Sequence, residues 1–154
     1  FTCRSRRPPL DNVNALLSFA YSLLASDCAA ALEGAGLDPY VGFLHRARPG
    51  RRSLALDLME ELRTVLADRF VLSCINQKVL NAKHFEKQEN GAILLTEEGR
   101  RAFLNAWQQK KREVITHPFL KEKLCWGLVP YVQALLLART LRGDLEVYPP
   151  FFWK

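Results

Sequence analysis

The aliphatic side chains of this chain are dominated by leucine, with 26 Leu against 3 Ile and 9 Val. β-Branched residues favour strands, whereas Leu is readily accommodated in helices. The ratio therefore predicts a mainly α fold. The chain has 154 residues, of which 49% are hydrophobic and 25% are charged. This size and composition are those of a single globular domain, and they argue against a disordered tail, a collagen-like fibre or a disulfide-stabilised miniprotein.

The distribution of proline, charge and aromatic residues divides residues 1–154 into three parts of one predicted helical domain. Residues 1–10 form an expected basic arm that is extended and ends in two prolines. Residues 11–146 form the expected helical body. The ending LEVYPPFFWK cannot be helical across its two prolines, so residues 147–154 are predicted to form an aromatic tail.

Helix caps and breakers set the element boundaries within the body. The turn sequence ENG followed by AILL predicts one short β-hairpin within residues 78–95. Arg142 and Gly143 are expected to end the last helix. Four helices are predicted. The first is capped by Asp11 and ends at Gly34, and the second runs from Ser53 to the mid-70s. The third is capped by Thr96 and runs from Glu97 to about Glu113, and the fourth runs from Thr116-His117-Pro118 to about Leu141.

The cysteines and the hydropathy pattern indicate a cellular setting. Cys3, Cys28, Cys74 and Cys125 are widely separated and form no C-x-x-C pair, so they predict neither a zinc site nor a disulfide framework but buried thiols in a reducing cytoplasm. No apolar run reaches about 18 residues, and no secretory signal pattern is present, so we expect no membrane partner. Since the chain begins at Phe1 and not at Met, we expect a fragment that lacks its natural N-terminal part.

The charge balance favours a polyanionic partner. Lys and Arg total 22 against 16 Asp and Glu, which gives a net charge of +6, and nucleic acid is the commonest partner of such a surface. The first 70 residues hold nine Arg and no Lys, and Arg can bind phosphate through two parallel hydrogen bonds. A codon bias in a GC-rich genome explains the same Arg preference equally well.

The segment 45–60 carries the residues with the greatest chemical potential. Asp57 and Glu60 are three residues apart on a predicted helix and therefore share a face, together with Ser53. His45 lies in the preceding loop and, folded back, would bring an imidazole beside the two carboxylates. Such a set can hold Mg²⁺ or Mn²⁺, and a phosphate-binding rim beside a metal is what phosphoryl transfer on DNA requires. Four arginines follow the histidine and would form that rim: Arg46, Arg48, Arg51 and Arg52.

Each of these features also has a structural interpretation. An acidic pair near a helix start is usually a solvated face that suits the helix dipole, and a single loop histidine is more often packed or exposed than a ligand. His84 and His117 are predicted to be structural or surface residues. Tyr21 fits a core position better than a phosphate-binding one. The Arg100-Arg101 and Lys110–Arg112 clusters are expected to be solvated, and the aromatic tail fits packing on its own domain or docking on a partner equally well.

Three motifs resemble one protein family. They are RSRRPPLDNVNALLSFAY at 4–21, GLDPYVGFLH at 36–45 and SLALDLMEELR at 53–63. Their order and spacing are similar to those of the CRISPR spacer-acquisition integrase, the first CRISPR-associated (Cas) protein. The stretch 89–113 and the ending YPPFFWK look like the version found in type I-C systems. The resemblance covers essentially the whole chain and implies the multi-helix C-terminal catalytic domain of that integrase.

The resemblance implies a metal-dependent DNA endonuclease and integrase that inserts new spacers into the repeat array by transesterification. On this sequence the family's metal-binding histidine matches His45 and its second acidic ligand matches Glu60, with Mg²⁺ or Mn²⁺ as the ion. Asp57 would be an auxiliary catalytic acid or a ligand of a second metal. Tyr21 matches a catalytic-site tyrosine, and Arg63 is expected to touch the DNA backbone.

The family's first glutamate ligand and its N-terminal β-sandwich, which makes the dimer contact, are expected upstream of Phe1. Neither Glu33 nor Glu61 matches that ligand. Two protein ligands hold Mg²⁺ poorly because the ion favours its water shell. We therefore expect an incomplete site in this chain alone. The alternative function is a catalytically incomplete module that binds only DNA and proteins, and a helix-turn-helix regulator ranks well below both.

The resemblance also implies partners. They are double-stranded DNA, as the prespacer and the CRISPR repeat, a homodimer in the full-length parent, the second Cas protein, and in type I-C systems the fourth Cas protein. The tail at 147–154 is a candidate docking element for either of these Cas proteins.

Overall fold

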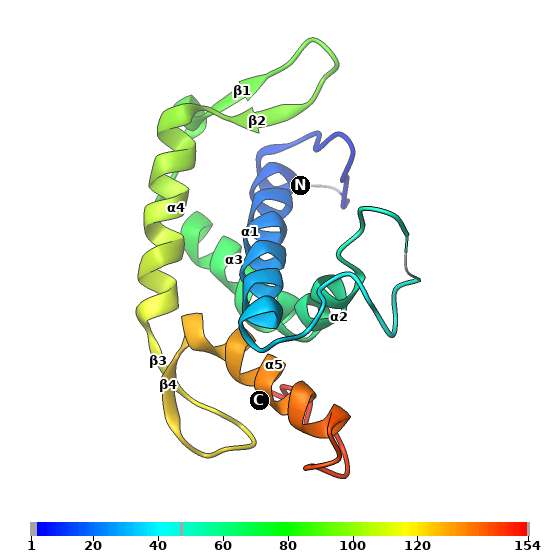
Figure 1. Cartoon of the computed structure of the whole chain (residues 1–154). Helices are drawn as coiled ribbons and strands as arrows, with labels where there is room; N and C mark the ends of the chain where they lie inside the picture. Colours follow the sequence, from blue (N-terminus) through cyan, green and yellow to red (C-terminus); the bar gives the residue numbers. More distant parts are fainter. Residues whose placement is uncertain (1–2, 47, 154) are drawn as a thin grey trace.

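The computed structural model describes residues 3–46 and 48–153, and these residues are mainly helical, as predicted (Figure 1). Two small antiparallel hairpins complete the described part. The helices are α1 Asn12–Gly34, α2 Ser53–Leu62, α3 Arg69–Asn76, α4 Glu97–Arg112 and α5 Val129–Leu141. The strands are β1 Phe85–Lys87, β2 Ile93–Leu95, β3 Val114–Thr116 and β4 Lys123–Cys125.

Helix α1 is the centre of the body and packs against α2, α3 and α5 (Figure 1). Asp11 caps it as predicted, since its carboxylate accepts a hydrogen bond from the Asn14 backbone N–H at 2.8 Å. By length and composition alone α1 could cross a membrane, with a mean hydropathy of 1.5. Core helices pass the same test, and the apolar residues Ala20, Leu24 and Leu32 of α1 are fully buried in the core.

The predicted helix from Ser53 to the mid-70s is present as α2 and α3, but a π-helical segment, Arg63–Asp68, joins them. Hydrogen bonds in a π-helix span five residues, which widens the turn. The π-helical segment buries Leu66 and Ala67 on successive positions. This break in the α-helical register was not predicted.

The predicted hairpin within 78–95 is confirmed. Strands β1 and β2 pair antiparallel with Phe85 opposite Leu95, and Gly91 adopts a φ of 81° in the connecting turn. Thr96 then caps α4 by accepting a hydrogen bond from the Gly99 N–H. α4 ends at Arg112, close to the predicted end.

The predicted helix from Thr116 to Leu141 is wrong in its first half. Residues 114–125 form the second hairpin, in which Ile115 pairs with Leu124, and α5 begins only at Val129. The β-branched run Val114–Thr116 favours a strand. Pro130, and not Pro118, occupies the first turn of the helix, where proline is well tolerated. Gly143, with φ 84°, follows the end of α5 as expected.

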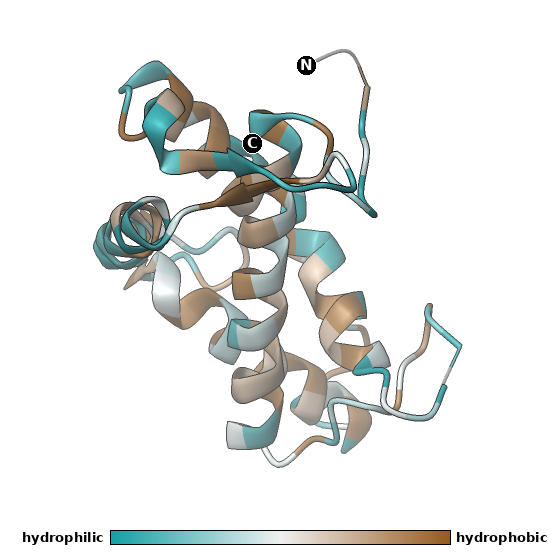
Figure 2. Cartoon of the chain, turned by 90° about the horizontal axis from the view of Figure 1, so that it is seen from above, coloured by the Kyte–Doolittle hydropathy of each residue, from teal (hydrophilic) through white to brown (hydrophobic). Residues whose placement is uncertain are grey.

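Aromatic packing attaches α4 and the tail to the body. Phe103 and Trp107 of α4 lie against the Phe70 ring with centroid separations of 5.0 Å. The opposite side of α4 is largely hydrophilic (Figure 2), and Arg100, Arg101 and Arg112 are exposed as expected. Lys110 and Lys111 are instead half-buried and pair with Glu113 and Asp27, which corrects the expectation that the second cluster is solvated. In the tail, Phe151 is buried and stacks on Trp153, whereas Phe152 is 75% exposed. The tail therefore packs largely on its own domain.

The thiols follow the prediction in part. Cys28 and Cys74 are buried, and burial raises the pKa of both thiols, that of Cys74 to about 11. Cys125 is half-buried. Cys3 is exposed, which corrects the expectation that all four thiols are buried.

Candidate functional site

The loop before α2 folds back over the start of that helix. The Pro39 carbonyl accepts hydrogen bonds from the backbone N–H groups of Leu54 and Ala55, at 2.9 and 3.2 Å. These N–H groups have no partner within their own helix, so the loop acts as its cap. Gly42 lies so close to the helix that a Cβ at this position would meet the Ser53 Cβ at 2.6 Å.

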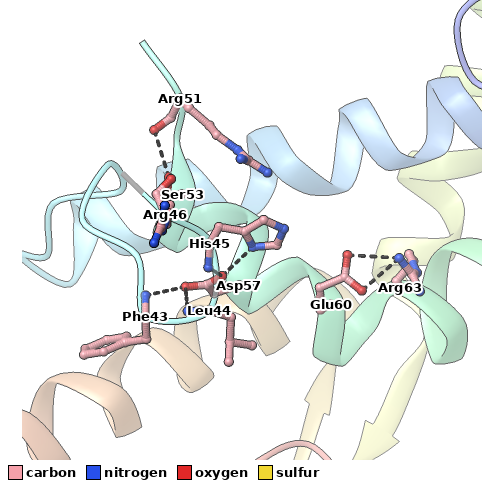
Figure 3. Close-up of polar contacts among 9 residues, drawn as sticks. All are labelled: Phe43, Leu44, His45, Arg46, Arg51, Ser53, Asp57, Glu60 and Arg63. Carbon is pink, nitrogen blue, oxygen red and sulfur yellow. Dashed lines mark hydrogen bonds and ion pairs between the residues drawn. The ribbon is translucent and has the colours of Figure 1, made fainter. Parts of the chain in front are cut away.

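Asp57 anchors the loop to α2 through four contacts (Figure 3). Its Oδ2 accepts the backbone N–H groups of Phe43 at 2.6 Å and Leu44 at 3.0 Å. Its Oδ1 accepts the His45 backbone N–H at 3.0 Å and contacts the His45 ring at 2.6 Å. Burial alone would raise the pKa of Asp57, but the ring and the three N–H groups hold it below its ordinary value. The carboxylate is therefore a buried anionic anchor with both oxygens occupied.

The contact with Asp57 fixes the state of the His45 imidazole. An ionised carboxylate only accepts hydrogen bonds, so Nδ1 of His45 must carry the proton. In the neutral ring, Nε2 then keeps its lone pair and can bind a metal. Figure 3 shows the ring directed away from the loop and toward Glu60. A carboxylate behind a histidine is the usual way in which proteins orient a metal-binding imidazole.

Glu60 lies on the same face as Asp57, one turn further along α2. Its carboxylate pairs with the Arg63 guanidinium, with Nη1 at 2.9 Å from Oε1 and 2.8 Å from Oε2. Both side chains are about one-third exposed. Arg63 therefore neutralises Glu60 in this structure, and its contact with DNA stays a prediction.

His45 and Glu60 supply two of the ligands that a divalent cation needs. One neutral imidazole nitrogen and one carboxylate are donors that Mn²⁺ and Mg²⁺ accept. Asp57 is used by the loop, so it fits the predicted role of a second-metal ligand less well than that of an orienting group. Within residues 3–46 and 48–153, no group of three or more His, Cys, Asp or Glu side chains could hold a metal together.

A polar cleft of about 360 Å³ lies beside Glu60. Tyr21 of α1 lines it, and two guanidinium groups lie over its ring, with Arg4 at 5.5 Å and Arg63 at 6.0 Å from the ring centroid. The Tyr21 hydroxyl donates a hydrogen bond to Asp68, and burial together with this bond raises the pKa of Tyr21 to about 12. The prediction had weighed a core position against a phosphate-binding one, and Tyr21 lies at the boundary, half-buried and facing the cleft.

The basic arm contributes residues that the site prediction had omitted. Arg6 and Arg7 line the cleft together with Arg4. Arg4 is held by Asn14 Oδ1 at 2.7 Å and Ser18 Oγ at 3.1 Å, and its Nε is buried with no hydrogen-bond partner among the described residues. The motif around 4–21 had identified the arm, but nothing in its spacing indicated that the arm would reach the cleft beside Glu60.

The four arginines of the loop lie on the outer side of the same region. Arg46, Arg48 and Arg52 are exposed and Arg51 is half-buried. None of the four forms an ion pair with another part of the chain that the structure describes. Their charges are therefore available to a polyanion.

The other two histidines are structural, in agreement with the prediction. His84 caps its own turn by accepting the Asn81 N–H at 3.1 Å. His117 is fully buried, accepts the N–H groups of Phe119 and Leu120 at Nδ1, and contacts the Gln133 amide at 2.9 Å through Nε2.

Comparison with known proteins identifies similar sequences and structures. The family model described as "CRISPR associated protein Cas1" matches residues 1–109. A CRISPR-associated endonuclease Cas1 from Rhodospirillum rubrum is 62% identical over the whole chain, which spans 45% of the length of that relative.

Two solved structures share the fold. A casposase bound to an integration product has a TM-score of 0.83 at 30% identity, covering 94% of this chain and 42% of the casposase. A partial Cas6-RT-Cas1–Cas2 complex contains a chain with a TM-score of 0.80 at 30% identity, covering all of this chain and 45% of the other.

Proposed function

Because this chain belongs to the Cas1 family of CRISPR-associated proteins, we propose that it is the catalytic domain of a metal-dependent DNA endonuclease and integrase that inserts new spacers into a CRISPR array. One observation carries the proposal: Asp57 orients the His45 imidazole so that its free Nε2 faces the side on which Glu60 lies. The chain spans about 45% of its relatives' length, so the activity belongs to the natural protein that contains it.

His45 and Glu60 would hold the cation, Mg²⁺ or Mn²⁺. When bound, the metal neutralises charge that develops at the attacked phosphate and lowers the pKa of the attacking 3′-hydroxyl. Asp57 keeps the imidazole in the metal-binding tautomer. The missing ligands, at least one of them a further carboxylate, would come from outside the described residues or from water.

Arg63 has two successive partners in this proposal. In the metal-free structure its guanidinium neutralises Glu60. If Glu60 holds the cation, the Arg63 guanidinium would be free for another partner, and Arg63 already lines the cleft beside Tyr21. There it can bind a DNA phosphate, as the sequence predicted, because Arg matches phosphate with two parallel hydrogen bonds.

The cleft and the Arg-rich loop would hold the DNA on either side of the metal ligands. In the cleft, the exposed guanidinium groups of Arg6 and Arg7 would bind DNA phosphates, and Arg4 adds positive charge beside Tyr21. Arg46, Arg48, Arg51 and Arg52 offer sequence-independent phosphate contacts. Tyr21 orients and does not act as a base, since its hydroxyl is committed to Asp68.

The substrates and partners follow from the family. We propose prespacer and repeat duplexes as the DNA and the second Cas protein as an assembly partner, since a similar chain occurs in a Cas1–Cas2 complex. The homodimer, the type I-C assignment and the fourth Cas protein stay predictions. The cytoplasm is the proposed location, because it holds the array and keeps thiols reduced.

Strand transfer tests the proposal. The natural protein that contains this chain is incubated with branched DNA and Mn²⁺, beside its His45→Ala and Glu60→Gln variants. We expect both variants to lose activity by more than about 100-fold while DNA binding in the presence of a chelator is unchanged. Full activity of either variant would contradict the assignment of that ligand.

A second candidate function is binding of DNA and proteins without catalysis. It is favoured by the finding that no group of three or more metal-binding side chains exists among the described residues. In that case the affinity of the domain for DNA would fall steeply with salt and would be independent of Mn²⁺, and no strand transfer would occur in the natural protein. A loss of DNA binding on chelation would exclude this candidate.

A further inference from the structure

We infer that Glu61 is a positioning residue for Glu60, and that a buried polar network from the C-terminal tail holds it in place. Glu61 is next to Glu60 on α2, and successive residues of an α-helix point about 100° apart. Glu60 can therefore face the metal side while Glu61 faces α5 and the tail. The inference rests on the proposed function, because it assigns Glu61 a role through a proposed metal ligand.

Three donors converge on one oxygen of Glu61. Its Oε2 accepts the Tyr148 hydroxyl at 3.0 Å, the Gln133 side-chain N–H at 3.1 Å and the Phe151 backbone N–H at 3.1 Å. Gln133 is fully buried and belongs to α5, whereas Tyr148 and Phe151 belong to the tail. Hydrogen bonds to a charged acceptor are stronger than neutral ones, so these contacts fix the carboxylate to two separate elements.

His117 sets the direction of this network. Its Nδ1 accepts two backbone N–H groups, so in the neutral ring Nε2 carries the proton and donates to the Gln133 Oε1 at 2.9 Å. The oxygen of the Gln133 amide therefore faces His117, and its NH₂ group faces Glu61 and Tyr148. Burial lowers the pKa of His117, which keeps the ring in this neutral state.

Helix α2 needs such an anchor at this position. The π-helical segment begins at Arg63, two residues after Glu61, so the regular α-helical bonds do not continue beyond this point. An open apolar groove of about 410 Å³ lies between α2 and α5, and Leu58, Leu137, Glu60 and Glu61 all border it. Apolar packing therefore leaves this part of α2 uncovered, and the polar network on Glu61 supplies a constraint there.

The tail thus has a function within its own domain. The residues Tyr148 and Phe151 tie it to the helix that carries Asp57 and Glu60. The earlier hypothesis that the tail docks on another Cas protein concerns other atoms, chiefly the exposed Phe152 ring.

Mn²⁺ titration of the natural protein that contains this chain tests the inference. Glu61→Gln keeps the shape but removes the charge, and Tyr148→Phe removes one donor and keeps the ring. Loss of a group bonded directly to a metal ligand costs about 10- to 100-fold in metal affinity. Glu61 acts one step further away from the metal. We therefore expect the Mn²⁺ dissociation constant of the Glu61→Gln variant, measured by calorimetry, to be about 3- to 10-fold higher than that of the wild type. Tyr148→Phe should give a smaller rise.

Asp27→Asn is the matched control. Asp27 accepts the Trp107 indole N–H at 3.1 Å and pairs with Lys111, so it joins α1 to α4 away from the site. It should lower thermal stability without changing Mn²⁺ affinity. In the metal-free protein, hydrogen exchange of the α2 amides should accelerate in Glu61→Gln and Tyr148→Phe but not in Asp27→Asn.

The outcomes separate the inference from the proposed function. Unchanged Mn²⁺ affinity in Glu61→Gln and Tyr148→Phe, with loss of Mn²⁺ binding in Glu60→Gln, would overturn the inference alone. An equal shift in Asp27→Asn would also overturn it, since general destabilisation would explain the result. If Glu60→Gln binds Mn²⁺ and transfers strands like the wild type, the metal-ligand assignment itself fails.

Discussion

Replacing Asp57 by Asn tests whether one buried carboxylate prepares His45 for catalysis. An Asn oxygen can still accept the N–H groups of Phe43 and Leu44. Its NH₂ group would then face His45, which already presents a backbone N–H and a ring N–H on that side. The ring must change tautomer, which places the proton on Nε2 and removes the lone pair from the metal side.

The size of the effect follows from these contacts. Two hydrogen bonds to a charged acceptor are lost, each worth about 1.5–3 kcal/mol before water replaces part of it. Since His45 is 28% exposed, we take a net loss of about 2 kcal/mol for the ordered loop, which is roughly 30-fold in population. Strand transfer should therefore fall by about 30- to 100-fold, in the range expected for groups behind a metal ligand.

The assay compares Mn²⁺-dependent strand transfer and thermal stability in Asp57→Asn and in a control. Asp38→Asn is the control, because Asp38 is exposed in the same loop and its carboxylate accepts the Tyr40 backbone N–H at 2.9 Å. We expect the control to stay within about twofold of the wild type, as is usual for exposed substitutions. Wild-type activity in Asp57→Asn would refute the orienting role.

Three further predictions concern the same loop and helix. Gly42→Ala should lower both thermal stability and strand transfer, because the new Cβ would lie 2.6 Å from the Ser53 Cβ and 2.8 Å from the His45 carbonyl oxygen, so the loop must move; normal stability and activity would contradict this. Arg63→Gln should tighten Mn²⁺ binding by up to about fivefold, since an exposed ion pair is worth about 0–1 kcal/mol, and should weaken DNA binding; looser Mn²⁺ binding would contradict the competition between guanidinium and metal. The folded-state pKa of Asp57 lies below that of the unfolded carboxyl, so its anchoring contribution is complete above about pH 4 and is lost as the pH falls through the lowered value. Hydrogen exchange of the amides at Phe43 and His45, corrected for intrinsic rates, should show the loop opening only at the acid end, and opening that begins near neutral pH would count against the anchor.

The helical parts of the fold could be predicted because local chemistry determines them. Asp11 and Thr96 cap the helices that the sequence assigned to them, and Gly91 forms the predicted turn. The second hairpin was missed because Pro118 follows a Thr-His pair that resembles a helix start. The β-branched run Val114–Thr116 was a local strand signal that the helix interpretation passed over, and the burial of His117 against Gln133 is a tertiary contact that no local pattern shows.

The candidate site was predictable where residues are close in sequence. The loop histidine and the acidic pair on α2 suggested that His45 folds back, and its contact with Asp57 confirms that geometry. Arg63 lies three residues after Glu60 on the helix, a spacing at which side chains meet, so their ion pair could have been predicted but was not. The role of Arg4 was also hidden, because a residue of the arm reaches the cleft only through packing on α1.

The most direct test of the central claim is to detect the His45 nitrogen in the coordination sphere of bound Mn²⁺. Pulsed electron paramagnetic resonance of the natural protein that contains this chain, loaded with Mn²⁺, reports coupling to a directly bound ¹⁴N nucleus. We predict that the wild type shows this coupling and that both His45→Ala and Asp57→Asn lose it. Mn²⁺ bound in the wild type without ¹⁴N coupling, or coupling that persists in His45→Ala, would contradict the assignment of His45 as a metal ligand.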